Sequence, residues 1–338
     1  MRYLSLFSGI EAASVAWEPL GWECVAVAEV DAFASAVLAH RYPSVPNLGD
    51  VTKIDAADLA ALGRIDLVVF GSPCQDLSVA GKREGLAGER SGLFHTAVDI
   101  VRWAREYCGC RWALWENVCG AFSSNKGRDF AAVVGELAGV DVPVPPKGWG
   151  TEGAAVGSEG MVEWAVLDAQ WFGVAQRRRR VFALADFGDW ASRPPVLLEP
   201  QSLRGDSPPR REPGQGASAD VAPVDEEGCE PYTLAIRGRE GGATLEYRQD
   251  GLSNAILTPT GGRSGAGVGA VAHNLQVRRL TPTEAERLMG FPDGHTLIPY
   301  RGKPAADGHR YRSLGNSMAV PVMAWIGRQI DIAESGLA

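Results

Sequence analysis

Apolar and polar positions in the first half of the chain alternate between two periodicities. Short apolar runs that end in polar or glycine residues have the length of buried β-strands. Strands are predicted in RYLSLF (2–7), ECVAVAEV (23–30), IDLVVF (65–70) and RWALWEN (111–117). Helical spacing of apolar residues follows them in 11–20, 31–42, 91–107 and 127–139. Strands this apolar, separated by helices, are typical of a parallel sheet covered on both faces, which predicts an α/β domain.

The second half of the chain is less regular. Residues 142–160 are rich in proline and glycine, which predicts a loop, and regular structure returns at 161–187. Residues 194–228 have the proline, glycine, serine and charge content of a connector. Two short strands and a glycine-rich loop are predicted at 232–240, 254–260 and 261–270.

Capping signals mark two helix starts. Asp31 is a good N-cap for the helix that follows it. Thr281 with Glu284 three residues later forms a capping box in LTPTEAERLMG. The last segment, 311–330, is predicted to be a turn leading into an apolar helix.

Three parts are therefore expected along the chain. Residues 1–184 form an α/β domain, 185–277 a loop-rich insert of small strands, and 278–338 a segment that returns to the first domain. This division is based on the change in composition near each boundary.

Composition excludes several classes of protein. The 338 residues are 45% hydrophobic, which is ordinary for a globular protein with a real core. No run approaches the roughly 20 apolar residues that a membrane helix needs, and the first predicted strand begins too early for a cleaved signal peptide. A soluble intracellular protein is therefore expected. Six cysteines in this length do not suggest a disulfide framework. Cys108, Cys110 and Cys119 lack the paired spacing of zinc ligands, so no metal site is predicted.

The charge pattern does not decide whether the protein binds nucleic acid. A net charge of −8 and a sequence pI of about 5.3 argue, taken alone, against nucleic acid. The distribution of charge matters more than its sum, and arginines are frequent from residue 176 onward. A basic surface on an acidic protein is therefore compatible with the sequence.

Residues after the first predicted strands suggest a nucleoside site. Gly9 precedes a helix, and Glu29 ends the second strand, where nucleotide-binding α/β folds place a carboxylate on ribose hydroxyls. Glu11 and Ala12 occupy later glycine positions of the dinucleotide motif, so a cofactor without phosphates fits better. Asp50 would accept from an adenine amino group if it ends the third strand. An ordinary strand–turn–helix connection and a turn aspartate are the alternatives.

A cysteine just beyond a predicted strand is a stronger indication of a functional site. In FGSPCQDLS the apolar run ends in Gly-Ser-Pro, and Cys74 follows at the edge of the sheet where ligands bind. Reactive thiols need a partly exposed setting, whereas structural cysteines more often lie inside apolar elements. Glu116 ends the next strand, where desolvation would raise its pKa and suit it to donate a proton. A surface glutamate at a strand end is the alternative.

Alternation separates the arginines of QRRRRVFAL into two groups. As a strand, it places Gln176, Arg178 and Arg180 on one face and Arg177 and Arg179 on the other. An arginine face at the ligand edge would hold a phosphate or a pyrimidine carbonyl. A solvated charged face is the alternative.

The order of these motifs resembles that of the cytosine-C5 DNA methyltransferases. The matching elements are FSG, the EVD segment, GD, GSPCQDLS, ENV, QRRRR, RRLTPTEAERLMGFP and GNSMAVPV, over nearly the whole chain except the insert. The resemblance implies a Rossmann-like S-adenosylmethionine-dependent methyltransferase domain with a small loop-rich target-recognition domain. It also implies S-adenosyl-L-methionine as cofactor, S-adenosyl-L-homocysteine as product, and double-stranded DNA as partner.

Site roles follow from the resemblance, position by position. Cys74 corresponds to the nucleophile, Glu116 to the acid that protonates cytosine N3, and Arg178 and Arg180 to arginines that support the base. The cofactor pocket corresponds to Phe7, Ser8, Gly9, Ile10, Glu29, Val30, Asp50, Val51, Pro73, Leu93, Asn316 and Ser317. DNA contacts are predicted for Gln75, Ser78, Lys82, Arg237, Arg239 and Arg263. The departure at Glu11 is expected to lower cofactor affinity without abolishing binding.

Two rival functions belong to the same scaffold: RNA cytosine methylation and a catalytically silent DNA-binding relative. The sizeable insert favours duplex DNA, and intact Cys74 and Glu116 favour an enzyme. The broken glycine pattern excludes a nicotinamide-dependent oxidoreductase. A monomer in the cytoplasm of a bacterial or phage-infected cell is expected, with a cognate restriction endonuclease as a possible partner. The spacing of residues does not reveal the target sequence.

Overall fold

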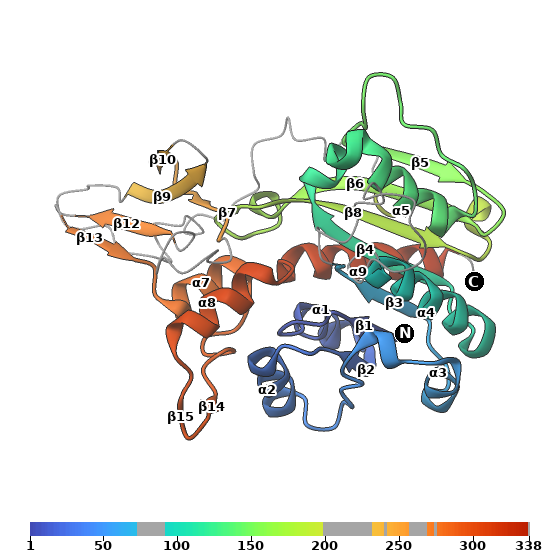
Figure 1. The fold of residues 1–338 in the computed structure, drawn as a ribbon, viewed down its shortest axis with the longest axis horizontal. Helices are drawn as coiled ribbons and strands as arrows, with labels where there is room; N and C mark the ends of the chain where they lie inside the picture. Colours follow the sequence, from blue (N-terminus) through green and yellow to red (C-terminus); the bar gives the residue numbers. More distant parts are fainter. Residues whose placement is uncertain (73–91, 199–231, 240–241, 257–268, 274–275, 337–338) are drawn as a thin grey trace.

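A large mixed sheet with helices on both faces, and a smaller sheet beside it, make up the protein (Figure 1). The computed structural model describes residues 1–72, 92–198, 232–239, 242–256, 269–273 and 276–336. Six residues of the predicted site lie outside this part of the chain: Pro73, Cys74, Gln75, Ser78, Lys82 and Arg263.

Seven strands form the large sheet, in the order β2-β1-β3-β4-β8-β6-β5. They are β1 (Arg2–Leu6), β2 (Glu23–Ala28), β3 (Leu67–Phe70), β4 (Trp112–Val118), β5 (Glu152–Val156), β6 (Met161–Asp168) and β8 (Arg179–Asp186). The parallel pairing predicted for the first half is confirmed, because β2, β1, β3 and β4 run parallel. The remaining strands complete the sheet by antiparallel pairing.

The predicted loop at 142–160 is wrong over β5. This strand alternates between exposed and half-buried residues at the edge of the sheet. A short turn joins it to β6, and such a turn permits only antiparallel pairing because a parallel neighbour needs a long crossover. The sequence did not predict this strand because the proline and glycine residues around it indicated a loop.

Alternate residues of the central strands enter two separate cores. Tyr3 faces the first core, and its neighbour Leu4 faces the second. The first core includes residues of α1 (Ala12–Trp17), α2 (Ala32–Arg41), α7 (Pro282–Met289), α8 (Asp307–Asn316) and α9 (Val320–Ser335). The second includes residues of α3 (Ala56–Leu62), α4 (Gly92–Cys108) and α5 (Arg128–Ala138). The parallel strands are therefore buried on both faces.

Both predicted helix caps are confirmed. The Asp31 carboxylate accepts from the backbone N–H groups of Phe33 and Ala34, at 3.0 and 2.9 Å. Thr281 and Glu284 form the reciprocal capping box at the start of α7. The segment before α9, predicted to be a turn, instead contains the ten-residue helix α8.

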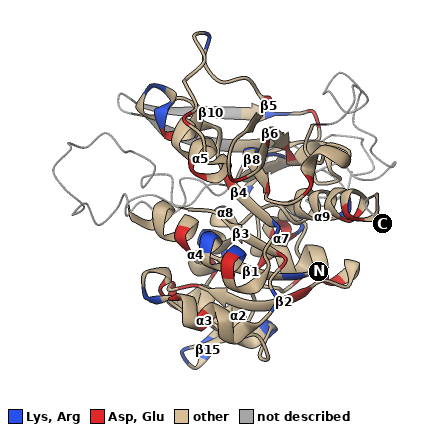
Figure 2. Cartoon of the chain, turned by 90° about the vertical axis from the view of Figure 1, so that its right-hand side faces the viewer, with Lys and Arg blue, Asp and Glu red and all other residues tan. Residues whose placement is uncertain are grey.

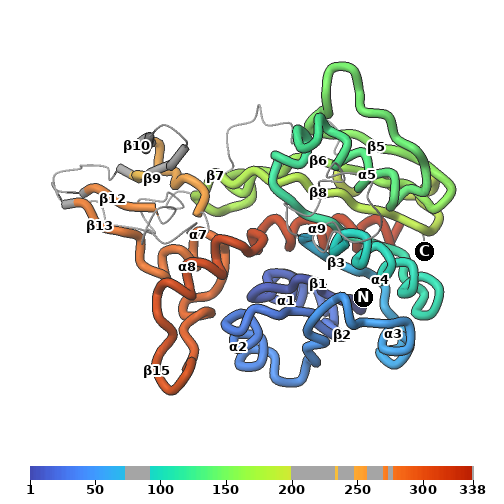
Figure 3. Tube along the Cα trace, viewed as in Figure 1, coloured from blue at the N-terminus to red at the C-terminus, as the bar shows by residue number. Residues whose placement is uncertain are grey.

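The C-terminal helix α9 lies against the N-terminal half, as the trace in Figure 3 shows. Trp17 of α1 donates its indole N–H to the Met323 carbonyl at 2.7 Å. Gly327 faces the same indole so closely that an added Cβ would lie 2.6 Å from Trp17 ring atoms. The close approach of α1 and α9 therefore requires a glycine at position 327.

Alanine at position 327 is expected to lower the free energy of unfolding by about 1–3 kcal/mol, because the methyl group must displace the Trp17 indole. Gly308 of α8 is a matched helical control, since a Cβ there meets nothing within 4 Å. Gly308→Ala is expected to change stability by less than about 1 kcal/mol. Urea unfolding measures both, and equal stability of the two variants would contradict the packing argument.

The smaller sheet has four antiparallel strands in the order β10-β9-β12-β13. They are β9 (Tyr232–Arg239), β10 (Gly242–Arg248), β12 (Ala270–His273) and β13 (Gln276–Arg279). The sequence predicted β9 but missed β10. Of the strand predicted at 254–260, residues 257–260 lie outside the described part of the chain. Among residues 254–256, Asn254 alone belongs to a strand, β11 (Ser253–Asn254), which pairs with β7 (Gln176–Arg177).

The chain stays on the large sheet beyond residue 185, where the predicted insert begins. Residue 185 lies inside β8, and the buried Glu163 of β6 binds the segment that follows. Its carboxylate accepts from Arg193 Nη1 at 2.6 Å and from the backbone N–H groups of Val196 and Leu197. Residues up to Leu197 are therefore anchored to this sheet, and the division into domains stays a prediction.

Charges of both signs are interspersed along α4 and α5 (Figure 2). Arg102 of α4, for example, pairs with Glu136 of α5 at 2.8 Å. The described residues on the face in view therefore form no continuous basic surface.

Candidate active site

A cavity of about 800 Å³ opens at the carboxyl ends of the parallel strands. This edge is where α/β sheets bind ligands. Predicted site residues that line the cavity are Phe7, Gly9, Glu29, Val30, Asp50, Val51, Leu93, Glu116, Arg178, Arg180 and Asn316. The structure therefore brings most of the described predicted residues together around one cavity.

Three predicted cofactor residues do not line the cavity: Ser8, Ile10 and Ser317. Ser8 joins the ends of two strands, because its hydroxyl donates to the Ser5 carbonyl and accepts from the Ala28 N–H. Ile10 is fully buried, and the Ser317 carbonyl accepts from Arg178. Ser8 and Ser317 therefore bond to residues that line the cavity, Ala28 and Arg178, whereas Ile10 belongs to the first core.

The loop after β1 has an unusual backbone. Phe7, Gly9 and Glu11 all have left-handed conformations, with φ of 53°, 58° and 64°. Such values are strained for the two residues that carry a Cβ. The Gly9 N–H donates to the Glu29 carboxylate at 2.7 Å, so the end of β2 holds this loop in place.

Glu29 binds backbone in addition to facing the cavity. Its second carboxylate oxygen accepts from the N–H groups of Val30 and Asp31 at 2.8 and 2.7 Å. Charge-assisted bonds of this kind fix the carboxylate in one orientation. Glu29 therefore joins the ends of β1 and β2 beside the cavity.

Asp50 lies at the cavity, but not at the end of a strand as the sequence analysis supposed. It precedes a short 3₁₀ helix at Val51–Lys53 and caps it. Its carboxylate accepts from the Thr52 N–H and hydroxyl at 3.0 and 2.8 Å, and these bonds lower its pKa. The third strand, β3, begins only at Leu67.

Glu116 is a buried carboxyl group at the end of β4. Burial raises its pKa, and the nearby guanidinium groups of Arg180 and Arg178 oppose that rise. Arg180 Nε lies 3.2 Å from Glu116 Oε1. A carboxyl group with a raised pKa beside a cavity is better suited to donate a proton than an ordinary glutamate.

Alternation in the arginine run occurs as predicted. Gln176 and Arg178 are buried and Arg180 is half-buried, whereas Arg177 and Arg179 are exposed. Arg178 donates to three backbone carbonyls: Ile256, Gly315 and Ser317. Desolvation lowers its pKa to about 9. Arg178, between β7 and β8, therefore binds the chain at the end of α8 and just after it.

Methionine at position 178 is expected to lower the free energy of unfolding by about 2–4 kcal/mol, because three buried carbonyls lose their donor. Arg177→Met is the matched control, since its side chain is exposed on the opposite face of the same segment. Urea unfolding should show a change below about 0.5 kcal/mol for the control. Similar losses in both variants would contradict the assigned role of Arg178.

The end of β3 is fixed to β4 by residues that the sequence-based site did not include. Asn117 Nδ2 donates to the Ser72 carbonyl at 3.0 Å, and Trp115 Nε1 donates to the Ser72 hydroxyl at 3.1 Å. Asn117 stands in the ENV motif, so that motif contained the available signal. Cys74 comes two residues after Ser72, outside the described part of the chain.

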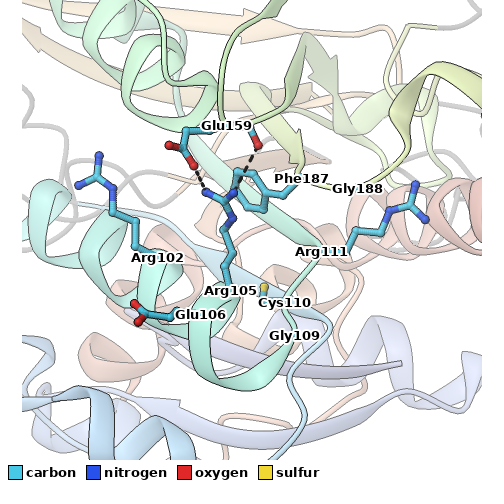
Figure 4. Close-up of a pocket in the computed structure, with 9 residues that line it drawn as sticks. All are labelled: Arg102, Arg105, Glu106, Gly109, Cys110, Arg111, Glu159, Phe187 and Gly188. Atoms are coloured by element: carbon cyan, nitrogen blue, oxygen red, sulfur yellow. Dashed lines mark hydrogen bonds and ion pairs between the residues drawn. The ribbon is translucent and has the colours of Figure 1, made fainter.

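A second cavity, of about 590 Å³, lies at the amino end of β4 (Figure 4). Its arginines are each paired with a carboxylate: Arg102 with Glu136, Arg105 with Glu159 and Arg111 with Asp186. The described residues that line it therefore offer no free cation to an anionic ligand.

Neither a metal site nor a membrane helix is found in the described residues. They contain no group of three or more His, Cys, Asp or Glu side chains placed to hold a metal ion. Within the same residues, no helix has both the length and the apolar character needed to span a membrane.

The sheet order and the cavity at its carboxyl edge define a Rossmann-like methyltransferase fold. The family model for C-5 cytosine-specific DNA methylases matches residues 1–191 and 231–331. The chain therefore belongs to this family, which confirms the family predicted from its motifs.

The relatives and the solved structure that this chain resembles are all named as methyltransferases. A protein of Escherichia phage P1 named DNA N-6-adenine-methyltransferase is 33% identical, over 98% of this chain and 61% of its own length. Type II methyltransferase M2.BsuMI of Bacillus subtilis is 29% identical, over 100% of this chain and 77% of its own. The crystal structure of S. pombe Dnmt2 methyltransferase covers 98% of both chains with a TM-score of 0.64 at 17% identity, which shows the shared fold.

Proposed function

We propose that this protein transfers a methyl group from S-adenosyl-L-methionine to C5 of a cytosine in duplex DNA, leaving S-adenosyl-L-homocysteine. The observation that carries the proposal is the buried Glu116–Arg180 pair at the end of β4, next to the strand that leads toward Cys74. Membership of the cytosine-C5 family supports the same reaction.

The chemistry of the cavity fits the proposed cofactor. Phe7, Val30 and Leu93 supply apolar surface for a purine, and Val30 is exposed although it is hydrophobic. Glu29 and Asp50 supply carboxylates for hydroxyl and amino groups. When bound there, S-adenosyl-L-methionine supplies an electrophilic methyl group at its sulfonium.

The residues of this chain activate the base. The Cys74 thiolate adds to C6 of cytosine while Glu116 gives a proton to N3, so the electron pair of the C5–C6 double bond becomes available at C5. Arg180 holds the Glu116 carboxyl group in place. After methylation, C5 loses its proton to a base, the C6–sulfur bond breaks, Cys74 leaves as a thiolate, and N3 returns its proton to Glu116.

Duplex DNA requires the target base to leave the helix before this chemistry can occur. We assign recognition of the target sequence to the insert, which includes β9, the strand that carries Arg237 and Arg239. Phosphate contacts normally dominate affinity for DNA. We further infer a monomer that acts in the cytoplasm of a bacterial or phage-infected cell. A cognate restriction endonuclease is the proposed partner in a type II system.

The name of the phage P1 relative provides a second candidate, N6 methylation of adenine in DNA. That name describes a longer protein, of which the matched region is 61%. The name therefore does not assign the adenine reaction to the part that this chain resembles. The Glu116–Arg180 pair favours the cytosine reaction, which needs an acid at N3.

Mass spectrometry of nucleosides from DNA and RNA tests the proposal, after each is incubated with the protein and S-adenosyl-L-methionine. 5-Methylcytosine in DNA is the expected product. 5-Methylcytosine found only in RNA would indicate that RNA is the substrate, and N6-methyladenine in DNA would support the second candidate. No methylated base from well-folded protein would indicate a silent binder.

A further inference from the structure

A buried carboxylate lies under the loop that borders the cofactor cavity. Glu11 is two residues after Gly9, which lines the cavity, and its side chain caps α1. Only 1% of the residue is exposed. Its left-handed backbone, with φ of 64°, is strained for any residue except glycine. A strained, buried acid beside a binding loop calls for a functional explanation.

The hydrogen-bond partners of Glu11 are all neutral. Its carboxylate accepts from the Ser5 hydroxyl at 2.8 Å, the Tyr3 hydroxyl at 3.4 Å, and the Ser14 N–H and hydroxyl at 3.1 and 3.2 Å. No ion pair joins it to a cation within the described residues. When ionised, Glu11 therefore carries a negative charge without a cationic partner among the described residues, two positions after Gly9 of the cavity wall.

Glu11 also changes charge near neutral pH. Desolvation raises its pKa to about 7, against the hydrogen bonds from Ser5, Ser14 and Tyr3. The titratable groups around it stay neutral there, because burial raises the pKa of Tyr3, Cys24 and Tyr42. Burial lowers the pKa of His295, which bonds to the Ile10 carbonyl, and so favours its neutral form.

We propose that Glu11 is a positioning residue whose buried negative charge makes the cavity prefer the sulfonium cofactor over its thioether product. The inference rests on the proposed cofactor. S-Adenosyl-L-methionine and S-adenosyl-L-homocysteine share their adenosine, amino and carboxylate groups and differ in one methyl group and one positive charge. A negative charge in a poorly solvated site stabilises the cation and leaves the neutral product without that attraction. The product is then released more readily.

Equilibrium binding without DNA tests this preference apart from activity. Calorimetry gives the Kd of each compound at about pH 6 and about pH 8, on either side of the Glu11 transition. The ratio of the Kd of the product to that of the cofactor is expected to rise by about three- to tenfold between these pH values. The sulfonium charge lowers the pKa of the cofactor's amino group relative to that of the product, so the rise is measured relative to Glu11→Gln, in which the two ligands titrate in the same way.

Glu11→Gln is expected to give a ratio that is lower than the wild-type ratio at about pH 8 and that lacks the three- to tenfold rise attributed to Glu11. Glu18→Gln is the matched control, because Glu18 is an exposed acid seven residues further along and should leave the wild-type ratio unchanged. If the glutamine variant does not fold, Glu11→Gly provides the same test, since glycine adopts the left-handed backbone without strain. A purely structural role would weaken binding of both compounds equally and leave the ratio as in the wild type.

Two outcomes separate failure of the inference from failure of the proposed function. Binding of both compounds with a ratio that changes with pH equally in the wild type and in Glu11→Gln would overturn the role of Glu11 and leave the proposed cofactor intact. Binding of neither compound by well-folded protein would overturn the proposed cofactor and the inference with it.

Discussion

Serine at position 74 is expected to lower cytosine methylation by a factor on the order of 10⁴ or more, because a hydroxyl does not ionise to the nucleophile that the addition to C6 requires. The described residues next to Cys74 support this role. Ser72 is fixed to β4 by bonds from Trp115 and Asn117, so the chain leaves β3 beside Glu116. Transfer of radiolabelled methyl groups to DNA measures the loss, and cofactor binding by calorimetry should be unchanged.

Cys119→Ser is the matched control for the thiol. Among the described cysteines, Cys119 is the nearest in sequence to Glu116, because it follows β4 directly. It is half-buried near Arg179 and Arg180. Burial raises its pKa, so it is a poor thiolate and its variant should retain activity.

DNA with 5-fluorocytosine at the target gives a second readout of the same role. Fluorine cannot leave C5 as a proton does, so the C6–sulfur bond persists after methylation. Wild-type protein is expected to form a covalent complex and Cys74→Ser is not. An equal loss of activity in Cys119→Ser, or a covalent complex with Cys74→Ser, would contradict the assignment of the nucleophile.

Local signals explain what the sequence predicted correctly. Asp31 and Thr281 cap helices through bonds to residues two or three positions away, so the necessary chemistry is visible in a few consecutive letters. The burial pattern of Gln176 to Arg180 follows from the period of two in an extended chain. The parallel strands are likewise continuous apolar runs, because helices cover both faces of the sheet.

Distant contacts explain what the sequence did not predict. Helix α8 is polar and was missed, since its stability depends on Arg310 bonding to Thr296 and on Tyr311 donating to the Leu280 carbonyl. Pairing along the antiparallel half of the sheet is equally non-local. The carbonyls bound by Arg178 come from Ile256, Gly315 and Ser317, 78 to 139 positions away, and no motif encodes these partners.

Glutamine at position 116 is expected to lower the rate of methyl transfer by about 10²–10⁴-fold, because an amide cannot give a proton to cytosine N3. Glutamine keeps the size of the side chain and an oxygen that can accept from Arg180. Single-turnover methylation measures this loss, and Glu106→Gln, in the exposed last turn of α4, should be as active as the wild type. A fully active Glu116→Gln variant would remove Glu116 from the reaction.

The pH dependence of the same variant separates proton donation from a structural role. Because burial raises the pKa of Glu116 above its ordinary value of 4.5, the wild-type rate should fall as pH rises through that raised pKa and the donor loses its proton. The glutamine variant should lose this falling limb. The free energy of unfolding should change with pH in the same direction as the rate. The contribution of protonated Glu116 is fully present below about pH 4.5 and is lost as pH rises through the raised pKa. At neutral and higher pH the variant should therefore unfold no more readily than the wild type. A low rate accompanied by marked destabilisation there would indicate that the substitution disrupts the fold rather than the proton transfer.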